Sequence, residues 1–355
     1  MNDHCKDFLV VADTVYGLVQ QAEGRTALIV RSGRIAYIGP EKPLRTLRQG
    51  LAVLRIRNLA PLFCDYHLHL RCPDSLECQR LAEQLLSHGI GQAYDAGSMC
   101  VKRSFQGRTL GKLIRIRTAR HAVSKKGGYG GFIGCQVSGL LEAAALIDRL
   151  ADSGADYLKV VHSGIYDPET DSITAGGFAR EELKGIVRHA EKRGLRVFCH
   201  VNGQRRVAEA VDAGVSCVIH GLGISATAMK RMSAQGVAFI PTIHAFETLS
   251  KIARTPAGRN NIAARVRGHL SAAREAFELG VPVLPGSDSG SSLLPYGAAF
   301  QAELSCFRKA GIPLHSIIHA AAISGLRQGM PADFQELEGI RPKRVFIRGE
   351  MVAKE

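Results

Sequence analysis

Between about residues 57 and 338, short β-branched runs alternate with amphipathic helical stretches, as in "ADYLKVVHSG", "AREELKGIVRHAEKRG" and "LRVFCHVNG". Eight runs qualify as strands, at residues 60–69, 90–96, 113–119, 156–162, 195–201, 215–220, 237–243 and 281–287. Eight parallel strand–helix units form a closed (β/α)8 barrel, and the active site of such a barrel lies at the carboxyl ends of its strands. The sequence therefore predicts an α/β fold with a TIM barrel over residues 57–338.

The two ends of the chain have a different pattern. Residues 1–56 alternate apolar and polar positions over short runs such as "RTALIVRSGRIAYIGP", and the last residues, "RPKRVFIRGEMVAKE", read as one more strand pair around Gly349. We therefore expect residues 1–56 and 339–355 to form a small β-sandwich domain beside the barrel.

The chain is strongly basic, with 46 Lys and Arg against 32 Asp and Glu and a formal charge of +14. These basic residues are spread along the sequence, and no helix-turn-helix, zinc-finger or RNA-recognition signature accompanies them. The charge is then typical of a solvated surface that attracts anionic small molecules. We expect no nucleic-acid partner, and a small-molecule substrate that bears a carboxylate.

The start, "MNDHCKDF", lacks the pattern of a secretory signal, and no long apolar run suggests a membrane span. The nine cysteines are scattered without a CxxC pair, which favours reduced thiols over a disulfide framework. These features predict a cytoplasmic protein. Association into a homo-oligomer is compatible with the pattern, although no interface can be identified.

The run "FCDYHLHL" places two histidines inside an apolar, strand-like stretch. Residues i and i+2 of a strand project from the same face, so His67 and His69 can both point into the barrel and bind one metal ion. A single histidine at a strand end is more often a hydrogen-bonded core residue. Further polar residues fall at other strand ends, however, and together they favour a metal centre over separate structural roles: Lys159, His200, His220 and Asp288.

This set of residues resembles the metal-dependent amidohydrolase superfamily, whose members carry HxH on strand one, histidines on strands five and six, and an aspartate on strand eight. The resemblance covers nearly the whole chain and extends to "GMPADF" near the end. Within the superfamily, "GADYLKVVHSG" and "AVDAGVSCVIHG" look most like the imidazolonepropionase-related and prolidase-like dipeptidase branch.

The resemblance implies two divalent metal ions that are bridged by a carboxylated Lys159. Zn is the metal that we expect. His67, His69 and Asp288 would bind one ion, and His200 and His220 the other. A carbamate suits this position because its negative charge helps to balance the two cations, whereas a free ammonium would repel them. The alternative is that Lys159 only forms an ion pair with Asp65 or Asp288.

The family mechanism would follow from the same residues. A bridging hydroxide attacks a carbonyl carbon, and Asp288 accepts the proton and passes it to the leaving nitrogen.

Substrate contacts are expected from the loops after the strands. The segment "HAVSKKGGYGGFIG" offers Lys125 and Tyr129, the segment after strand four offers Tyr166, and "IPTIHAF" after strand seven offers His244. Relatives often have a Gly-Gly-His sequence where this chain has Tyr129, so the resemblance does not single out one dipeptidase specificity. The alternative for the first of these loops is a flexible, solvated connection.

We therefore expect a metal-dependent amidohydrolase that cleaves an amide C–N bond, in a dipeptide or an N-acyl amino acid. A deaminase is one alternative, but deaminases of the superfamily place a glutamate soon after the strand-five histidine, and here the sequence is "HVNG". Cyclic amide, lactone or phosphoester hydrolysis needs the same hydroxide and stays open. A non-catalytic binding module is a more remote alternative.

Overall fold

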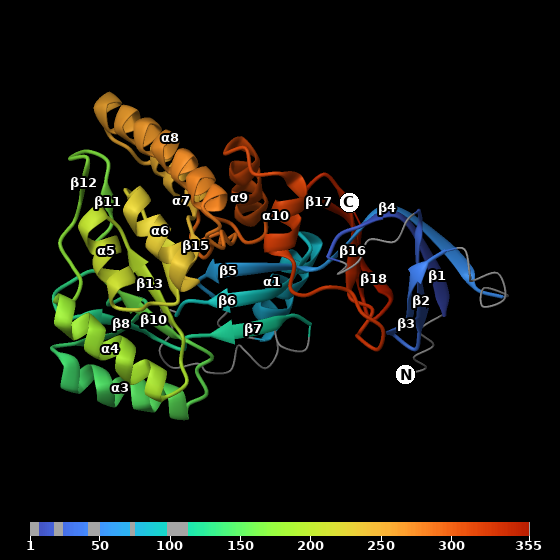
Figure 1. Ribbon diagram of the computed structural model, residues 1–355, viewed down its shortest axis with the longest axis horizontal. Coiled ribbons are helices and arrows are strands. Elements are labelled where there is room, and N and C mark those ends of the chain that lie inside the picture. Colours follow the sequence, from blue (N-terminus) through green and yellow to red (C-terminus); the bar gives the residue numbers. More distant parts are fainter. Residues whose placement is uncertain (1–6, 18–23, 42–49, 72–74, 98–112, 355) are drawn as a thin grey trace. The chain divides into compact units, whose positions relative to one another are not determined.

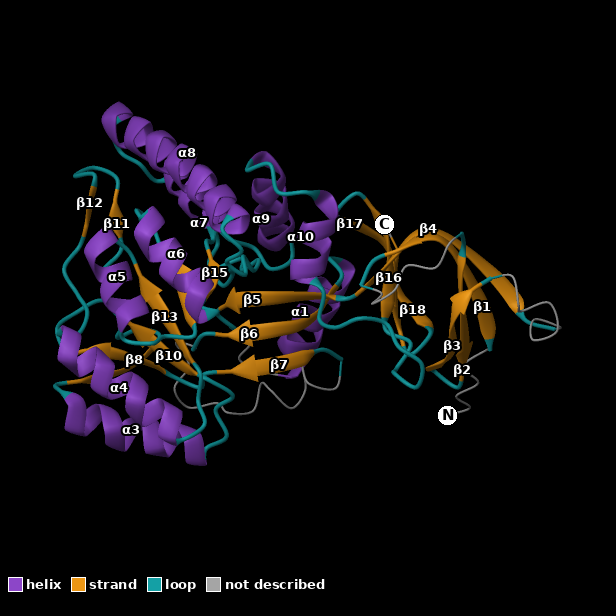
Figure 2. Cartoon of the chain, viewed as in Figure 1, coloured by secondary structure: helices purple, strands orange, loops and turns teal. Residues whose placement is uncertain are grey.

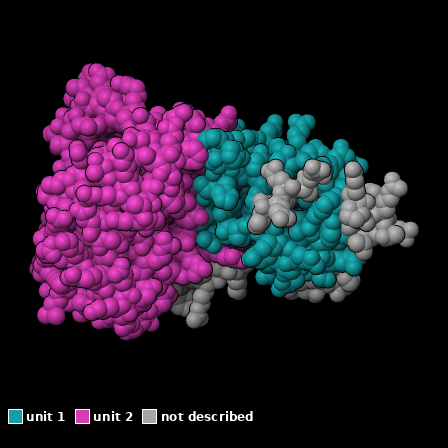
Figure 3. Space-filling model, in the orientation of Figure 1, with its two compact units in different colours: residues 1–64, 82–92, 313–355 teal, residues 65–81, 93–312 magenta. Residues whose placement is uncertain are grey.

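The computed structural model describes residues 7–17, 24–41, 50–71, 75–97 and 113–354 (Figure 1). The chain divides into two compact units, which Figure 3 shows in different colours. The first unit comprises Met1–Cys64, Ala82–Gln92 and Pro313–Glu355, and the second comprises Asp65–Leu81 and Ala93–Ile312.

The first unit contains a seven-stranded sheet to which both ends of the chain contribute, in the order β18-β17-β16-β4-β1-β2-β3. Strands β1 and β4 are parallel, and the other neighbours are antiparallel. The strands are β1 (Phe8–Val15), β2 (Thr26–Arg31), β3 (Arg34–Pro40), β4 (Ala52–Pro61), β16 (Phe334–Glu338), β17 (Arg341–Ile347) and β18 (Glu350–Lys354).

Both faces of this sheet are covered around β1 and β2. Val10 and Leu28 pack with Phe334 in one buried cluster, whereas Leu9 and Ile29 belong to a cluster on the other face. Because neighbouring side chains of a strand point to opposite faces, burial on both sides explains the continuous apolar runs in β1 and β2.

A six-stranded, wholly parallel sheet lies in the second unit, in the order β15-β14-β13-β10-β8-β9. Its strands are β8 (Ala122–Lys125), β9 (Gly134–Val137), β10 (Leu158–Val161), β13 (Val197–Val201), β14 (Cys217–His220) and β15 (Ala238–Ile240). A three-stranded sheet is formed by β5 (Phe63–Leu68), β6 (Ile90–Asp95) and β7 (Arg115–Thr118), and a short ribbon by β11 (Tyr166–Asp167) and β12 (Ser172–Ile173).

Helices follow the parallel strands along the chain, so the fold is α/β as predicted (Figure 2). The helices are α1 (Ser75–Ser87), α3 (Leu140–Asp152), α4 (Arg180–Lys192), α5 (Gln204–Asp212), α6 (Ala226–Gln235), α7 (Ile243–Thr248), η2 (Leu249–Lys251), α8 (Pro256–Glu278), α9 (Ala298–Lys309) and α10 (Leu314–Ala321). None of the described helices has both the length and the apolar character that a membrane span needs.

The predicted eighth strand, residues 281–287, is not a regular strand. It is held by single parallel bridges, Phe239 with Val283 on one side and Leu68 with Ser289 on the other. Pro282 and Pro285 explain the difference, because proline has no N–H to donate to a continuous ladder. Their carbonyls still accept, Pro282 O from Phe239 N at 2.8 Å and Pro285 O from Tyr66 N at 3.0 Å.

The predicted third strand is followed by a second strand where we expected a loop. β7 ends at Thr118, Arg120 then adopts φ 62°, and the chain continues as β8 in the six-stranded sheet. Part of the glycine-containing segment is therefore sheet rather than a flexible connection.

One cysteine departs from the expectation of reduced thiols. Cys78 is disulfide-bonded. The free cysteines of the described residues are Cys64, Cys135, Cys199, Cys217 and Cys306. A missing CxxC motif does not prevent a bond between cysteines at other spacings.

Candidate metal centre and active site

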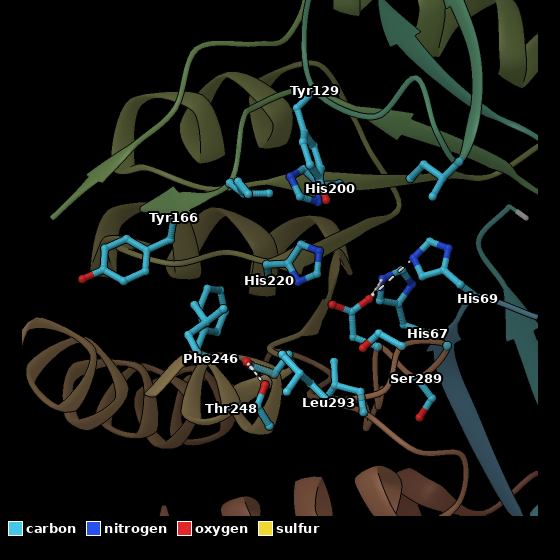
Figure 4. Close-up of a pocket in the computed structure, with 18 of the residues that line it drawn as sticks. His67, His69, Tyr129, Tyr166, His200, His220, Phe246, Thr248, Ser289 and Leu293 are labelled. Atoms are coloured by element: carbon cyan, nitrogen blue, oxygen red, sulfur yellow. Dashed lines mark hydrogen bonds and ion pairs between the residues drawn. The ribbon is translucent and has the colours of Figure 1, made fainter. Parts of the chain in front are cut away.

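The strand ends of the second unit bring the predicted metal ligands to one cavity of about 290 Å³ (Figure 4). β5 supplies His67, and His69 follows directly after it. β10 supplies the lysine, β13 and β14 one histidine each, and the irregular segment after β15 and α8 the aspartate. All six predicted ligands are among the residues that line the cavity: His67, His69, Lys159, His200, His220 and Asp288.

The donor atoms lie close enough to share cations. His67 Nε2 lies 3.1 Å and His69 Nε2 3.5 Å from Asp288 Oδ1. Ligand atoms of His67, His220 and Asp288 are all within 4.8 Å of one another. The rings of His200 and His220 have centroids 4.5 Å apart. Nitrogen and carboxylate ligands of zinc sit at about 2.0–2.2 Å from the ion, so this spacing suits a tight site.

Three of the histidines have one ring nitrogen already engaged by an oxygen. His69 Nδ1 lies 2.8 Å from Gly97 O, and His200 Nε2 lies 3.1 Å from Gly164 O. A carbonyl only accepts, so these nitrogens donate and the lone pair of each ring is on the other nitrogen. His220 Nδ1 contacts Thr242 Oγ1 at 2.7 Å, and this hydroxyl can either donate or accept. Such oxygen contacts orient metal-binding imidazoles in proteins.

Two buried side chains of the cavity have polar atoms that the protein does not fully satisfy. His67 Nδ1 and Lys159 Nζ have no hydrogen-bond partner, His67 Nε2 has only the Asp288 carboxylate at 3.1 Å beside it, and each residue is only 1% exposed. An unpartnered buried polar atom costs free energy. A bound cation would satisfy His67, and carboxylation would convert Lys159 into an anionic ligand, so the residues fit a metal centre. An ion pair of Lys159 with Asp65 or Asp288 is not formed.

Burial sets the charges of the cavity. It lowers the pKa of His67 and of His200 to about 3, with the charge of Lys159 as the second cause, and it lowers the pKa of Lys159 to about 8. Burial by itself would raise the pKa of Asp288. The contacts of His67 and His69 outweigh burial and hold this pKa well below its usual value. Neutral imidazoles and an ionised carboxylate are the forms that bind metal.

The backbone is strained at the ligands. His220, Thr242 and Asp288 have φ of 69°, 50° and 54°, a left-handed region that non-glycine residues rarely adopt. Such conformations cost about 1–3 kcal/mol each and persist only where the surroundings hold them.

A carboxylate beside the ligands supports this strained segment. Asp65 Oδ1 accepts hydrogen bonds from Ser287 N at 2.9 Å and His67 N at 3.2 Å, and Oδ2 accepts from Ser287 Oγ. Ser289 N in turn donates to Ser287 Oγ at 3.1 Å. The residues on both sides of Asp288 are thereby fixed to strand β5.

The predicted substrate-binding residues divide into two groups. Tyr129 and Tyr166 line the cavity, and the Tyr129 ring lies 5.3 Å from that of His200. Lys125 and His244 do not line it. Lys125 lies in strand β8 rather than on a free loop, and its Nζ donates to Ser138 O at 2.7 Å and to Glu182.

Sequence reasoning missed part of the cavity wall. Arg71 and Asn202 each lie two residues beyond a predicted ligand, His69 and His200, and this i+2 spacing could have indicated them. The apolar wall gave no such signal, because its residues come from segments far apart in the chain: Phe132, Ile133, Ile165, Ala245, Phe246, Leu249, Leu293 and Leu294.

Residues 59–328, which are most of the chain, match the model of the Amidohydrolase family. The chain therefore belongs to the amidohydrolase family, as its histidines, lysine and aspartate predicted.

A curated relative does not narrow the substrate. An uncharacterized protein of Mycobacterium tuberculosis is 29% identical over 214 residues, which is 58% of this chain and 55% of that protein. The chain thus matches about half the length of this curated relative.

Three solved structures show the fold. An Xaa-Pro dipeptidase with methionine in its active site has a TM-score of 0.80 at 18% identity, and the similarity covers 98% of this chain and 99% of the dipeptidase chain. The ochratoxinase of A. niger has a TM-score of 0.79 at 18% identity, with coverage of 99% and 97%. A prolidase complexed with N-methylphosphonate-L-proline has a TM-score of 0.77 at 20% identity, with coverage of 98% and 100%. These amidohydrolase neighbours imply a TIM-barrel fold.

Proposed function

We propose that the protein is a metal-dependent hydrolase that cleaves the amide C–N bond of a dipeptide or an N-acyl amino acid. The observation that carries the proposal is the convergence of four histidines, one buried lysine and one ionised aspartate on a single cavity. These are the residue types that bind and activate a hydrolytic water. The histidines and the lysine come from the ends of β5, β10, β13 and β14, and the aspartate from the irregular segment after α8.

The proposed cofactors are two divalent metal ions, and Zn is the metal that we propose. His67, His69 and Asp288 would hold one ion, His200 and His220 the other, and carboxylated Lys159 both. When bound, such ions supply a water of lowered pKa and polarise a carbonyl. The chain's own contributions are neutral imidazoles, two of them with a tautomer set by a backbone carbonyl, and the Asp288 carboxylate, which accepts the proton of the attacking water and returns it to the leaving nitrogen.

The rest of the cavity supports a substrate with one anionic end and an apolar body. Arg71 is placed to pair with a carboxylate, for which a guanidinium is well suited. Tyr129 and Tyr166 offer hydroxyl groups, and the aliphatic and aromatic wall suits an apolar side chain. The placement of Lys125 and His244 gives no support to a substrate role for either residue.

The finer architecture belongs to the same proposal. We infer that the strands of residues 57–338 close into a (β/α)8 barrel through the segment 281–289, whose hydrogen bonds to Phe239, Tyr66 and His69 support this closure. We also propose that residues 1–56 and 339–355 form the small β-sandwich and that the protein acts in the cytoplasm.

The test combines metal content with turnover. Protein purified without chelators should contain at least two equivalents of metal per chain and hydrolyse members of a panel of dipeptides and N-acyl amino acids. Asp288→Asn should reduce kcat by about 10²–10⁴-fold, because a positioned general acid–base contributes that much. Asp148→Asn, at a half-exposed aspartate outside the cavity, is the matched control and should leave kcat unchanged.

One outcome would replace the proposal. A single equivalent of metal, with release of ammonia from purines or pyrimidines and no amide hydrolysis, would identify a deaminase instead.

A further inference from the structure

A second group of metal-ligating side chains lies outside the cavity, between helices α7 and α9. It consists of His244, Glu247 and Cys306, whose donor atoms are all within 4.8 Å of one another. His244 Nδ1 lies 3.0 Å and Cys306 Sγ 3.5 Å from the same atom, Glu247 Oε2. None of the three lines the catalytic cavity.

The two helices place these groups on facing surfaces. His244 and Glu247 are three residues apart on α7 and therefore project from the same side of that helix. Cys306 is fully buried on α9, whereas the side chains of His244 and Glu247 are 23% and 26% exposed. The cluster thus has a buried sulfur at its base and access from solvent on the side of the imidazole and the carboxylate.

We propose that His244, Glu247 and Cys306 form a further binding site for a thiophilic divalent cation such as Zn²⁺, with water completing the coordination. Thiolate, imidazole and carboxylate are the ligand types that zinc uses, and three protein ligands with one open position are common for this ion. One thiolate and one carboxylate balance the two positive charges of the ion itself.

The hydrogen bonds of the cluster indicate how an ion would enter. The thiol of Cys306 donates to Glu247 Oε2, and His244 Nδ1 contacts the same oxygen. A cation would take the place of these two contacts. The thiol proton leaves to solvent, the imidazole binds through Nδ1 with its proton on Nε2, and no electron is transferred.

Neighbouring residues already hold the ligands in place. Lys309 Nζ binds the other carboxylate oxygen, Glu247 Oε1, at 2.9 Å, which leaves Oε2 for an ion. Glu303, one turn before Cys306, accepts hydrogen bonds from Ile243 N at 3.0 Å and His244 N at 2.8 Å. Such supporting contacts are characteristic of metal ligands, whose orientation depends on them.

An ion here would also fix part of the cavity wall. Helix α7 carries Phe246, which lines the cavity, and Leu249 follows directly in η2. The proposed ion would join α7 to α9 on the side that bears His244 and Glu247.

The test uses Co²⁺ added to the metal-stripped, full-length protein, because thiolate bound to Co²⁺ gives an intense charge-transfer absorption that nitrogen and oxygen ligands do not give. The wild type should show this band. Cys306→Ser should abolish it and lower the bound cobalt by one equivalent, whereas Cys135→Ser, at another free cysteine, should change neither. His244→Gln, a milder change, should weaken cobalt binding at this site at least tenfold.

This result is separable from the proposed catalytic function. The double variant His67→Ala/His69→Ala should lose cobalt from the catalytic cavity and keep the charge-transfer band. No band in the wild type at saturating Co²⁺, or a band that survives in Cys306→Ser, would overturn the proposal and leave the hydrogen-bonded cluster as a purely structural contact. A band without any amide hydrolysis would contradict the proposed function alone.

Discussion

At the scale of single residues, the environment gives each side chain of the cavity its chemical character. Lys159 is 1% exposed, and its Nζ has no hydrogen-bond partner, although lysine is normally a surface residue. Burial lowers its pKa to about 8, which raises the fraction of neutral amine. The neutral amine is the form that reacts with carbon dioxide, so the same burial that makes the ammonium costly favours the carbamate.

Replacement of this lysine tests its proposed role. Lys159→Ala should lose at least one equivalent of metal and at least about a hundredfold in kcat, because the ligand shared by both ions is absent. Short-chain carboxylates should restore part of the activity by occupying the vacated space. Elemental analysis and steady-state kinetics measure both effects, with Lys184→Ala on the surface of α4 as the control. Turnover equal to that of the wild type would exclude the carbamate.

At the scale of elements, helix α8 is anchored by an unusual buried polar group. Thr255 caps the helix through its hydroxyl, which accepts from Gly258 N at 2.9 Å. Further along, His269 is 2% exposed, and its Nε2 lies 2.8 Å from Pro241 O. Its ring meets those of Phe239 and Phe246 edge-on, so the imidazole must be neutral to fit this apolar contact.

The buried imidazole predicts a dependence of stability on pH. Burial lowers the pKa of His269 from 6.5 to about 4. Below pH 6.5 this histidine takes up a proton in the unfolded chain, whereas in the folded chain it stays neutral down to about pH 4. The contribution of His269 to stability is therefore complete above pH 6.5 and is lost as the pH falls from 6.5 to about 4. The loss amounts to about 3 kcal/mol at most.

His269→Gln isolates this contribution, since glutamine can still donate to the Pro241 carbonyl. Urea unfolding of the metal-stripped proteins at pH 7 and pH 4.5 should show that the wild type loses more of its unfolding free energy than the variant. Equal losses in both proteins would mean that His269 is not the group responsible.

At the scale of the whole molecule, the first unit depends on both ends of the chain. Strands β16, β17 and β18 extend the sheet that β1–β4 begin, and β16 pairs with β4. Phe334 of β16 is fully buried and stacks on Phe346 of β17 with ring centroids 4.6 Å apart. The core of this sheet is therefore incomplete until the last part of the chain has folded.

Removal of one ring from this core should be costly. Phe334→Ala should lower the free energy of unfolding by about 3–5 kcal/mol, which is the usual effect of truncating a buried phenylalanine. Met351→Ala, at an exposed position of β18, should stay within about 0.5 kcal/mol. Chemical denaturation followed by circular dichroism gives both values, and a change below 1 kcal/mol for Phe334→Ala would contradict the buried role.

Much of the fold and of the candidate site was accessible from local patterns. The period of two in "HLHL" predicted that His67 and His69 share a face, and the strand–helix alternation predicted that His200 and His220 end parallel strands. The family assignment followed from these residues and is confirmed by the family match over residues 59–328. Where local rules conflicted the prediction was wrong, as at residues 281–287, where Pro282 and Pro285 override an apolar run.

The sequence by itself determined which residue types stand at which strand ends, because side-chain period and strand propensity act over a few neighbouring residues. Only the tertiary structure decided which distant side chains meet. It brings Phe246 and Leu293 to the cavity wall, directs Lys125 to Glu182, and places His244 beside Cys306 instead of in the cavity. These contacts join segments far apart in the chain, and they depend on how helices and loops pack over the strands, which no local pattern encodes.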